Sequence, residues 1–257
     1  MPDTIKLHYS SSKTNWGDQL SPVICQLLSG CEIQYGKISN CDMIAIGSIL
    51  SRAKEHFFAK RIHVWGSGFI EPVPKHKTRH YIHAVRGRKS AQLLTNADVK
   101  VFGDPGLLCD QLIPNHKDIA KQHQIGIVPH YSERQHPDVI SFLEKCPEIK
   151  FIDIFSGITA FLEQLATCEF ILSSSLHGLI AADALGIANC RFKLGQKIVG
   201  GDFKFEDYYS IYNIAVPTSI TLDVFSAKLI DQIVTGYRRP EIDIIKQSLI
   251  DAFPFGR

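Results

Sequence analysis

Short apolar runs recur along the chain, and most are followed by a segment in which apolar residues return at helical spacing. The runs predict buried strands, and the helical period predicts helices with one buried face. The expected strands cover residues 5–9, 43–48, 62–69, 81–85, 99–102, 124–128, 150–152 and 170–172. The expected helices cover residues 21–28, 90–94, 138–145, 159–166, 176–185, 222–236 and 241–252. This alternation is typical of α/β proteins with parallel sheets.

One segment interrupts the alternation. Residues 113–117, Ile-Pro-Asn-His-Lys, match neither pattern, and a polar break with a proline is typical of a linker between domains. Strand and helix patterns occur on both sides of it. We therefore expect an α/β fold of two Rossmann-like lobes facing a cleft, an N-terminal lobe of residues 1–115 and a C-terminal lobe of residues 116–257.

The clearest strand-to-helix junction lies in the expected C-terminal lobe. An apolar run at residues 170–172 is followed by Ser173, Ser174 and Ser175, and His177 lies in the first turn of the next helix. The N–H groups and the positive dipole end of a helix N-terminus bind anions at the carboxyl edge of a parallel sheet. The pattern therefore predicts an anion site that includes a histidine. A purely structural interpretation, with capping serines and a satisfied core histidine, fits the same residues.

Other polar side chains lie at the ends of expected strands. Asn15 and Asp18 occupy the loop after the first strand, Ser67 lies in a Gly-Ser-Gly segment, and His130 ends the first strand of the C-terminal lobe. The carboxyl ends of parallel strands meet at one edge of a sheet, so these residues are candidates for substrate contacts. The asparagine, the aspartate and the glycines also favour turns, and a turn-forming role remains open for the loop.

A cluster of cations follows the strand at residues 81–85. Arg86, Arg88 and Lys89 surround the start of a short helix, where positive charge opposes the helix dipole. Such a cluster is either a solvated charged surface or a binding site for a phosphate or a carboxylate.

Composition excludes several classes of function. The 257 residues are 45% hydrophobic and 21% charged, with a net charge of +2 and no basic stripe. The sequence therefore gives no indication of nucleic-acid binding. Neither the dinucleotide fingerprint Gly-x-Gly-x-x-Gly after a strand nor a P-loop is present, so nicotinamide, flavin and P-loop nucleotide sites lose most of their support.

The cysteines and the N-terminus indicate the compartment. Seven cysteines, without a Cys-x-x-Cys pair, predict reduced thiols in the cytosol. The N-terminus lacks the pattern of a signal peptide, and no apolar stretch is long enough to span a membrane. No cluster has convincing metal-ligand spacing, and His76, His80 and His83 are expected on a solvated loop and strand. We expect a cytoplasmic protein without a metal.

Six fragments together carry a resemblance to a known family. They are Asn15-Trp16-Gly17-Asp18, Gly66-Ser67-Gly68-Phe69, Val85-Arg86 with Ser90, Gly103-Asp104-Pro105-Gly106, Val128-Pro129-His130-Tyr131 and Ser173-Ser174-Ser175-Leu176-His177-Gly178. In order and spacing, over nearly all of the chain, they resemble the polysaccharide pyruvyltransferase family, in particular short bacterial members acting in exopolysaccharide assembly. The resemblance implies a fold similar to B-type glycosyltransferases. It also implies transfer of pyruvate from phosphoenolpyruvate onto two sugar hydroxyls as a cyclic ketal, with release of phosphate.

The resemblance also implies roles for particular residues. Arg86 corresponds to the family arginine before a serine-containing helix, and His177 to the histidine of an Arg-Leu-His or Ser-Leu-His turn. This chain has Ser175 where the Arg-Leu-His members have arginine, so one anion clamp is missing or is supplied by another cation. The candidates for that cation are Arg86, Arg88, Lys89, Arg191 and Lys193.

Ketal formation needs an acid for the methylene carbon and a base for the attacking hydroxyl, and a histidine can serve as either. The catalytic residues expected from the resemblance are therefore His177, as general acid/base, and Arg86, which stabilises the leaving phosphate. Phosphoenolpyruvate is the donor substrate, and no cofactor is expected. The residues expected to bind substrate are Asn15, Asp18, Ser67, Arg88, His130, Ser173, Ser174, Ser175 and Lys193.

Two other functions fit the same residues. A B-type glycosyltransferase would use the helix N-terminus for the diphosphate of a nucleotide sugar, although the second lobe has no clear Glu-x-x-x-x-x-x-Glu-like clamp. A non-catalytic glycan-binding protein on this fold is the other alternative, because Ser175 replaces the arginine.

The resemblance implies a lipid-linked oligosaccharide acceptor, which would place the enzyme at the cytoplasmic face of the membrane as a peripheral protein. The candidate loop residues for that contact are Phe69, Ile70, Phe203 and Phe205, for which packing in the core is the alternative.

Overall fold

The computed structural model describes residues 3–11, 16–194 and 201–256. The chain divides into two units. Unit 1 comprises Met1–Gly106, Val199–Val216 and Pro240–Arg257, and unit 2 comprises Leu107–Ile198 and Pro217–Arg239. The sequence predicts a single division between residues 115 and 116, whereas here two later segments of the chain belong to unit 1.

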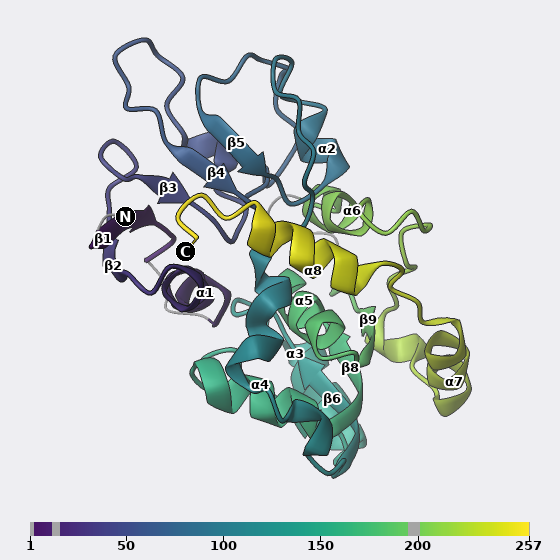
Figure 1. Cartoon of the computed structure of the whole chain (residues 1–257). Helices are drawn as coiled ribbons and strands as arrows, with labels where there is room; N and C mark the ends of the chain where they lie inside the picture. The colour runs from purple at the N-terminus through teal and green to yellow at the C-terminus, as the bar shows by residue number, and fades with distance from the viewer. Residues whose placement is uncertain (1–2, 12–15, 195–200, 257) are drawn as a thin grey trace. The chain divides into compact units, whose positions relative to one another are not determined.

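Unit 1 is built on a five-stranded sheet in the order β2-β1-β3-β4-β5, in which every pair is parallel (Figure 1). Its strands are β1 (Thr4–His8), β2 (Glu32–Tyr35), β3 (Met43–Ile44), β4 (His63–Trp65) and β5 (Tyr81–Ala84). The core of the sheet is formed by apolar residues of the central strands, of which Ile5, Met43 and Val64 are fully buried.

The helices of unit 1 come from all three of its segments. They are α1 (Trp16–Ser29), α2 (Arg88–Ala91), α6 (Phe203–Tyr209) and α8 (Ile242–Asp251), together with the 3-10 turn η1 (Leu50–Arg52). The sequence predicts that the first helix begins at residue 21, which is wrong. Trp16, Leu20 and Ile24 recur every four residues and are fully buried, so the apolar face extends the helix toward the N-terminus.

Helix α8 and the residues after it close the core of unit 1. The indole Nε1 of Trp65 donates a hydrogen bond to the carbonyl of Leu249 at 2.9 Å, and its ring packs against Phe253 at a centroid distance of 4.7 Å. Gly103 leaves space for this helix, because a Cβ there would lie 2.8 Å from the side chain of Leu249.

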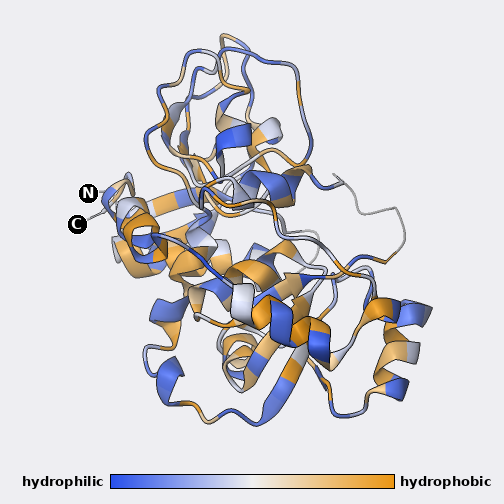
Figure 2. Cartoon of the chain, turned by 90° about the vertical axis from the view of Figure 1, so that its right-hand side faces the viewer, coloured by the Kyte–Doolittle hydropathy of each residue, from blue (hydrophilic) through white to orange (hydrophobic). Residues whose placement is uncertain are grey.

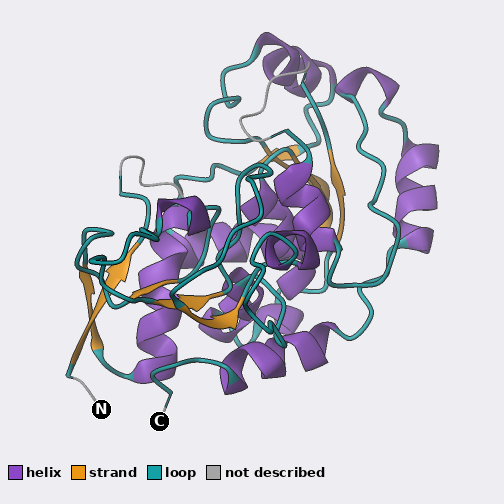
Figure 3. Ribbon diagram, turned by 90° about the horizontal axis from the view of Figure 1, so that it is seen from above, coloured by secondary structure: helices purple, strands orange, loops and turns teal. Residues whose placement is uncertain are grey.

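Unit 2 contains a four-stranded parallel sheet in the order β7-β6-β8-β9. Its strands are β6 (His123–Val128), β7 (Lys150–Phe151), β8 (Cys168–Ser173) and β9 (Ala188–Arg191). Its helices are α3 (Pro137–Lys145), α4 (Ile158–Ala166), α5 (Leu176–Ala184) and α7 (Ala227–Gly236), with the 3-10 turns η3 (His116–Asp118) and η4 (Leu222–Val224); the turn η2 (Pro105–Leu112) leads in from unit 1. Figure 3 shows these elements by type, with loops connecting them.

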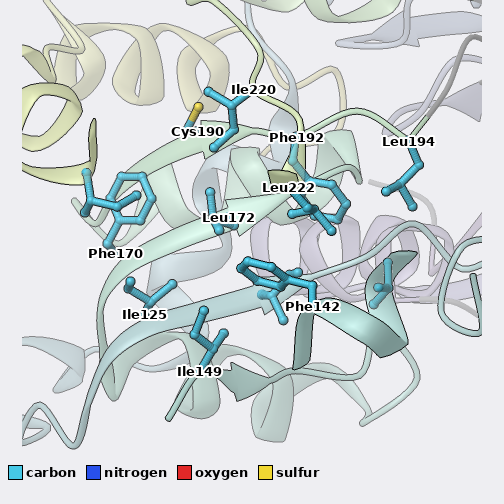
Figure 4. Close-up of a cluster of buried hydrophobic side chains, with 13 residues drawn as sticks. Ile125, Phe142, Ile149, Phe170, Leu172, Cys190, Phe192, Leu194, Ile220 and Leu222 are labelled. Atoms are coloured by element: carbon cyan, nitrogen blue, oxygen red, sulfur yellow. The ribbon is translucent and has the colours of Figure 1, made fainter. Parts of the chain in front are cut away.

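The two faces of the unit 2 sheet are packed differently. On one face Phe142 of α3, Ile230 of α7 and Leu222 of η4 pack on Leu172 and Phe192 in one apolar cluster (Figure 4). The opposite face holds α5, where Asn189 of β9 donates to the carboxylate of Asp183 at 2.5 Å. Because side chains alternate along a strand, Arg191 lies on the same face as Asn189.

The predicted α/β class with parallel sheets is confirmed, but several strands are shorter than predicted. The strand predicted at residues 43–48 ends at Ile44. Of the strand predicted at residues 99–102, only an isolated bridge between Val85 and Phe102 is formed. Glycines with positive φ at residues 47, 66 and 103 turn the backbone out of the extended conformation at these points. Hydrophobic residues gather on the strands and helices, and many hydrophilic ones lie in the connections (Figure 2). None of the helices in the described part of the chain has the length and apolar character needed to cross a bilayer.

Candidate functional site

The junction of β8 and α5 in unit 2 is held by the hydroxyl of Ser173. Its Oγ lies 2.9 Å from the carbonyl oxygens of both Val128 and Ser175, and it accepts a hydrogen bond from Ser175 N at 3.0 Å. Gly178 packs directly on this hydroxyl, since a Cβ at that position would lie 2.4 Å from Ser173 Oγ. The Ser-x-x-x-x-Gly spacing therefore fixes where α5 begins relative to the sheet.

Ser174 joins this junction to the end of β6. Its Oγ accepts a hydrogen bond from His130 N at 2.8 Å and donates to the carboxylate of Glu133, which is 8% exposed. The ring of His130 is bonded to Ser132 through Nδ1 at 2.7 Å. The structure thus brings the predicted His130 to the same edge of the sheet as Ser173 and Ser174, although both of these serine hydroxyls are engaged within the chain.

His177 is the second residue of α5, after the N-cap Ser175, whose side chain makes no capping hydrogen bond. From Phe170 to Leu185, all of which the structure describes, every residue is buried except His177. Within residues 170–185, His177 is therefore the one residue that is not fully buried, at the carboxyl edge of the sheet, although its Nε2 atom is itself buried.

Arg191 ends β9 in register with Ser173, which in turn is in register with Val128 of β6. It is 6% exposed and lies on the face that α5 covers. Lys193 lies two residues further along the chain and lines a cavity of about 570 Å³ in unit 2, together with Asp138, Lys145 and Asp223. Of the cations that the sequence proposes in place of an arginine at position 175, Arg191 is the one whose strand adjoins the Ser173 junction directly.

In unit 1 the cations after β5 are engaged by α6. The Arg86 guanidinium is fully buried and bonds Asp207 through Nε at 3.0 Å and Nη2 at 2.9 Å, the carbonyl of Phe69 at 2.6 Å, and the hydroxyl of Ser48. Asp207 is also fully buried and accepts from the N–H and the hydroxyl of Ser90, both at 2.7 Å. The positive charge of Arg86 is therefore buried within unit 1 and paired with the carboxylate of Asp207.

The neighbouring cations contact the same helix. Arg88 donates to Ser210 through its N–H at 2.8 Å and through Nε at 3.1 Å, and Lys89 pairs with Glu206. Gly87 permits this close approach, because a Cβ there would lie 1.8 Å from the carbonyl oxygen of Asp207. Arg86 is therefore paired inside unit 1, whereas Arg88 and Lys89 are partly exposed while they contact the segment of α6.

Residues 2–192 match the family described as polysaccharide pyruvyl transferase, which is well over half of the chain. This chain belongs to the polysaccharide pyruvyl transferase family. The family makes it a transferase that acts on a polysaccharide acceptor. The uncharacterized protein L143 of Acanthamoeba polyphaga mimivirus is 26% identical to it over 223 residues, which are 82% of this chain and 75% of that protein. A solved structure of the wall teichoic acid polymerase TagF aligns with 98% of this chain and 83% of its own at a TM-score of 0.44 and 9% identity.

Three other residues of this pyruvyl transferase, Asn15, Asp18 and Ser67, are predicted to bind substrate, and no common site follows from their positions. Asp18 lies in the first turn of α1 and not in a loop. Ser67 is fully buried and donates to the carbonyl of Gly47 at 2.9 Å. Asn15 lies outside the described residues.

Two buried carboxyl groups of unit 1 have no assigned role in the sequence prediction. Asp207 is the partner of Arg86, and its only signal in the sequence is a carboxylate among aromatic residues at 203–209. Asp104 accepts from Gly106 N at 2.9 Å, and burial raises the pKa of its carboxyl to about 6. The Arg86 charge opposes this rise in pKa.

Among the described residues, no group of three histidine, cysteine, aspartate or glutamate side chains is placed to hold a metal ion. His80 is not on a solvated loop as predicted, because it is 6% exposed and its Nδ1 accepts from Ile62 N at 3.3 Å. All seven cysteines are free thiols.

Proposed function

We propose that this pyruvyl transferase uses phosphoenolpyruvate as its donor and forms a cyclic pyruvate ketal on two hydroxyls of a sugar, with His177 at the reacting centre. The observation that carries the proposal is the position of His177 in the first turn of α5, as the one residue between 170 and 185 that is partly rather than fully buried. The identity of the family supports pyruvyl transfer, and the donor and the ketal are our inference from the family resemblance and the chemistry of the site.

The reaction divides into two additions. A proton moves to the methylene carbon of phosphoenolpyruvate, and the first sugar hydroxyl adds to the resulting oxocarbenium-like carbon while its own proton passes to a base. The carbon–oxygen bond to phosphate then breaks, phosphate leaves with the electron pair, and the second hydroxyl adds and loses its proton. One proton is taken up by carbon and two are given up by hydroxyls, so one remains for the phosphate.

His177 suits the proton transfers because an imidazole can both give and accept a proton near neutral pH. Its place in the first turn of α5 sets it beside the N-terminal amides of a nine-residue helix, where anionic groups are stabilised. In this proposal the phosphate or carboxylate of the donor lies at that helix end, and His177 faces the reacting carbon.

Arg191 is our candidate for the cation that replaces the arginine absent at position 175. It shares with Ser173 both a register position and a face of the sheet, at the edge where α5 begins. The sequence predicts that Arg86 stabilises the leaving phosphate, but its guanidinium is fully buried against Asp207. We therefore propose for Arg86 a positioning role in unit 1, where it holds the segment at Phe69 through the carbonyl it binds.

Ligand protection against thermal unfolding tests the donor. Phosphoenolpyruvate at about a hundred times its Kd should add about 2.7 kcal/mol to the free energy of unfolding, whereas a nucleotide sugar should add nothing. The protection should be lost in Arg191→Gln and kept in Arg134→Gln, a matched control whose surface pair is with Asp153. Protection by a nucleotide sugar alone would favour the glycosyltransferase alternative.

A further inference from the structure

Two phenylalanines form the most exposed apolar feature of the described chain. Phe57 is 84% exposed and Phe58 is 91% exposed, and the next large hydrophobic side chain among the described residues, Ile244, is 65% exposed. They are the two central residues of a tight turn that Ala59 N closes with a hydrogen bond to His56 O at 2.9 Å. Glycine, proline, asparagine and aspartate usually occupy such positions, so the turn itself gives no reason for two phenylalanines.

The turn is held in place from a neighbouring loop. Arg79 donates through its guanidinium to the carbonyls of both His56 and Phe57, and its own N–H donates to the Glu55 carboxylate at 2.9 Å. The rings of Phe57 and Phe58 pack edge to face at 5.4 Å. The backbone therefore holds the two rings together as one apolar tip, in the connection between β3 and β4. Figure 1 shows this connection as a long loop.

Cations are concentrated in the segment that contains this turn and in the segment that ends at Arg79, which holds it. Residues 52–61 and 75–79 contain seven lysines and arginines and one carboxylate, a net charge of +6, so the remainder of the chain carries −4 against the total of +2. The single carboxylate, Glu55, accepts from Arg79 N and lies 3.7 Å from Nε2 of His80. Lys60 is paired with Asp42, whereas Lys54, Lys75 and Lys77 in the same two segments are exposed.

We propose that the turn at residues 56–59 is a membrane-binding loop, in which Phe57 and Phe58 enter the interfacial layer of an anionic bilayer and the cations of these two segments contact the lipid headgroups. Aromatic side chains favour the membrane interface, and basic residues close to an anionic surface add electrostatic attraction. An exposed apolar tip with cations in the segments that form and hold it complements a flat anionic surface, not an apolar groove. Phe69 and Phe205, which the sequence offers for this contact, are 2% and 1% exposed and belong to the core.

This inference goes beyond the transfer reaction and does not depend on the identity of the pyruvyl donor. Membrane binding by the loop would bring the protein to the surface at which a lipid-linked acceptor is displayed. Vesicle binding without any substrate therefore tests it separately from the proposed function.

Cosedimentation with vesicles is the first test. The wild-type protein should bind phosphatidylcholine vesicles that contain phosphatidylglycerol, and should bind pure phosphatidylcholine vesicles weakly. Binding should be at least about tenfold weaker for Phe57→Ser/Phe58→Ser, because both apolar side chains are lost. The control Val224→Ser/Ile244→Ser, which also removes two exposed apolar side chains (53% and 65% exposed), should bind as the wild type does.

A tryptophan at the tip reports its depth. Trp16 and Trp65 are fully buried, so a fluorescence change in Phe58→Trp on adding anionic vesicles comes from the new side chain. Its emission should shift to the blue and be quenched by brominated lipid, and that of Ile244→Trp should not change. Equal vesicle binding by the double serine variant, or no binding by the wild type, would overturn the proposal and indicate a protein partner for the turn.

Discussion

Gly178 shows how closely one residue controls the candidate site. Its missing side chain allows α5 to begin against the hydroxyl of Ser173, which is bonded at the same time to the segment at Val128. The turn that presents His177 therefore depends on a hydrogen atom at position 178.

Gly178→Ala should lower the free energy of unfolding by about 1–3 kcal/mol, because the new methyl group would displace a hydroxyl that is held by three contacts. Gly236→Ala is the matched control in α7 of the same unit, where nothing lies within 4 Å of the added Cβ. It should be neutral or stabilising by up to about 1 kcal/mol. Denaturant unfolding followed by circular dichroism measures both, and an equal loss in the two variants would contradict this account of the junction.

The raised pKa of Asp104 predicts that the stability of the fold depends on pH. Its pKa is about 6 in the folded protein against an ordinary value of 3.8, so the folded state binds more protons between these values and stability falls as pH rises through that window. Relative to Asp104→Asn, the wild type should lose about 2 kcal/mol between about pH 4.5 and about pH 7.5. Unfolding at several pH values measures the difference, and two parallel curves would show that the carboxyl is ionised throughout.

At the scale of elements, the pairing of α2 with α6 is the main feature that links distant parts of the sequence in unit 1. Arg86 and Asp207 lie 121 residues apart and are both fully buried, so each is the counter-charge that the other requires. The short helix α2 has cations near its N-terminus, which oppose its dipole, and α6 supplies the compensating carboxylates.

Asp207→Asn should destabilise unit 1 by about 3–5 kcal/mol, because the Arg86 charge would remain buried without its partner. Glu206→Gln on the adjacent residue should cost less than about 1 kcal/mol, since the side chains of the Lys89–Glu206 pair are partly exposed to solvent. Tryptophan fluorescence during urea unfolding follows this unit, which contains both tryptophans of the chain. Similar losses in the two variants would contradict the assignment of Arg86–Asp207 as the central pair.

The spacing of apolar residues predicts a strand or helix well where that element is buried on all sides. The run at residues 170–172 and the helical spacing after it predict β8 and α5, because both are almost wholly apolar. The burial of Arg86 could not be predicted from the sequence. An arginine after a strand has the same sequence pattern when it binds a ligand and when it pairs with a distant carboxylate, here Asp207, which lies 121 residues away. The same limit applies to Phe57 and Phe58, whose exposure depends on the turn that Arg79 holds.

At the scale of the molecule, unit 1 is assembled from three stretches of chain. The expected linker at residues 113–117 lies within unit 2, while residues 240–257 return to unit 1, where Trp65 contacts Leu249 and Phe253. A linear division of the sequence cannot predict this, because it depends on contacts between residues nearly two hundred positions apart.

Ending the chain after Arg239 should therefore unfold unit 1, because the truncation exposes the fully buried Trp65 and removes the helix over Gly103. The emission of Trp16 and Trp65 should shift to the red. A truncated chain that keeps the emission of the intact protein would contradict the assignment of α8 to the core of unit 1.

The central claim is that pyruvyl transfer takes place at the β8–α5 edge of unit 2, and phosphate release from phosphoenolpyruvate tests it most directly. The wild type should release phosphate only when a glycolipid extract from the producing cells is present, and His177→Ala should be slower by about 10²-fold or more. His123→Ala, at the opposite end of the same sheet, should be as active as the wild type. Release that is unchanged in His177→Ala, or consumption of a nucleotide sugar in place of phosphoenolpyruvate, would contradict the account.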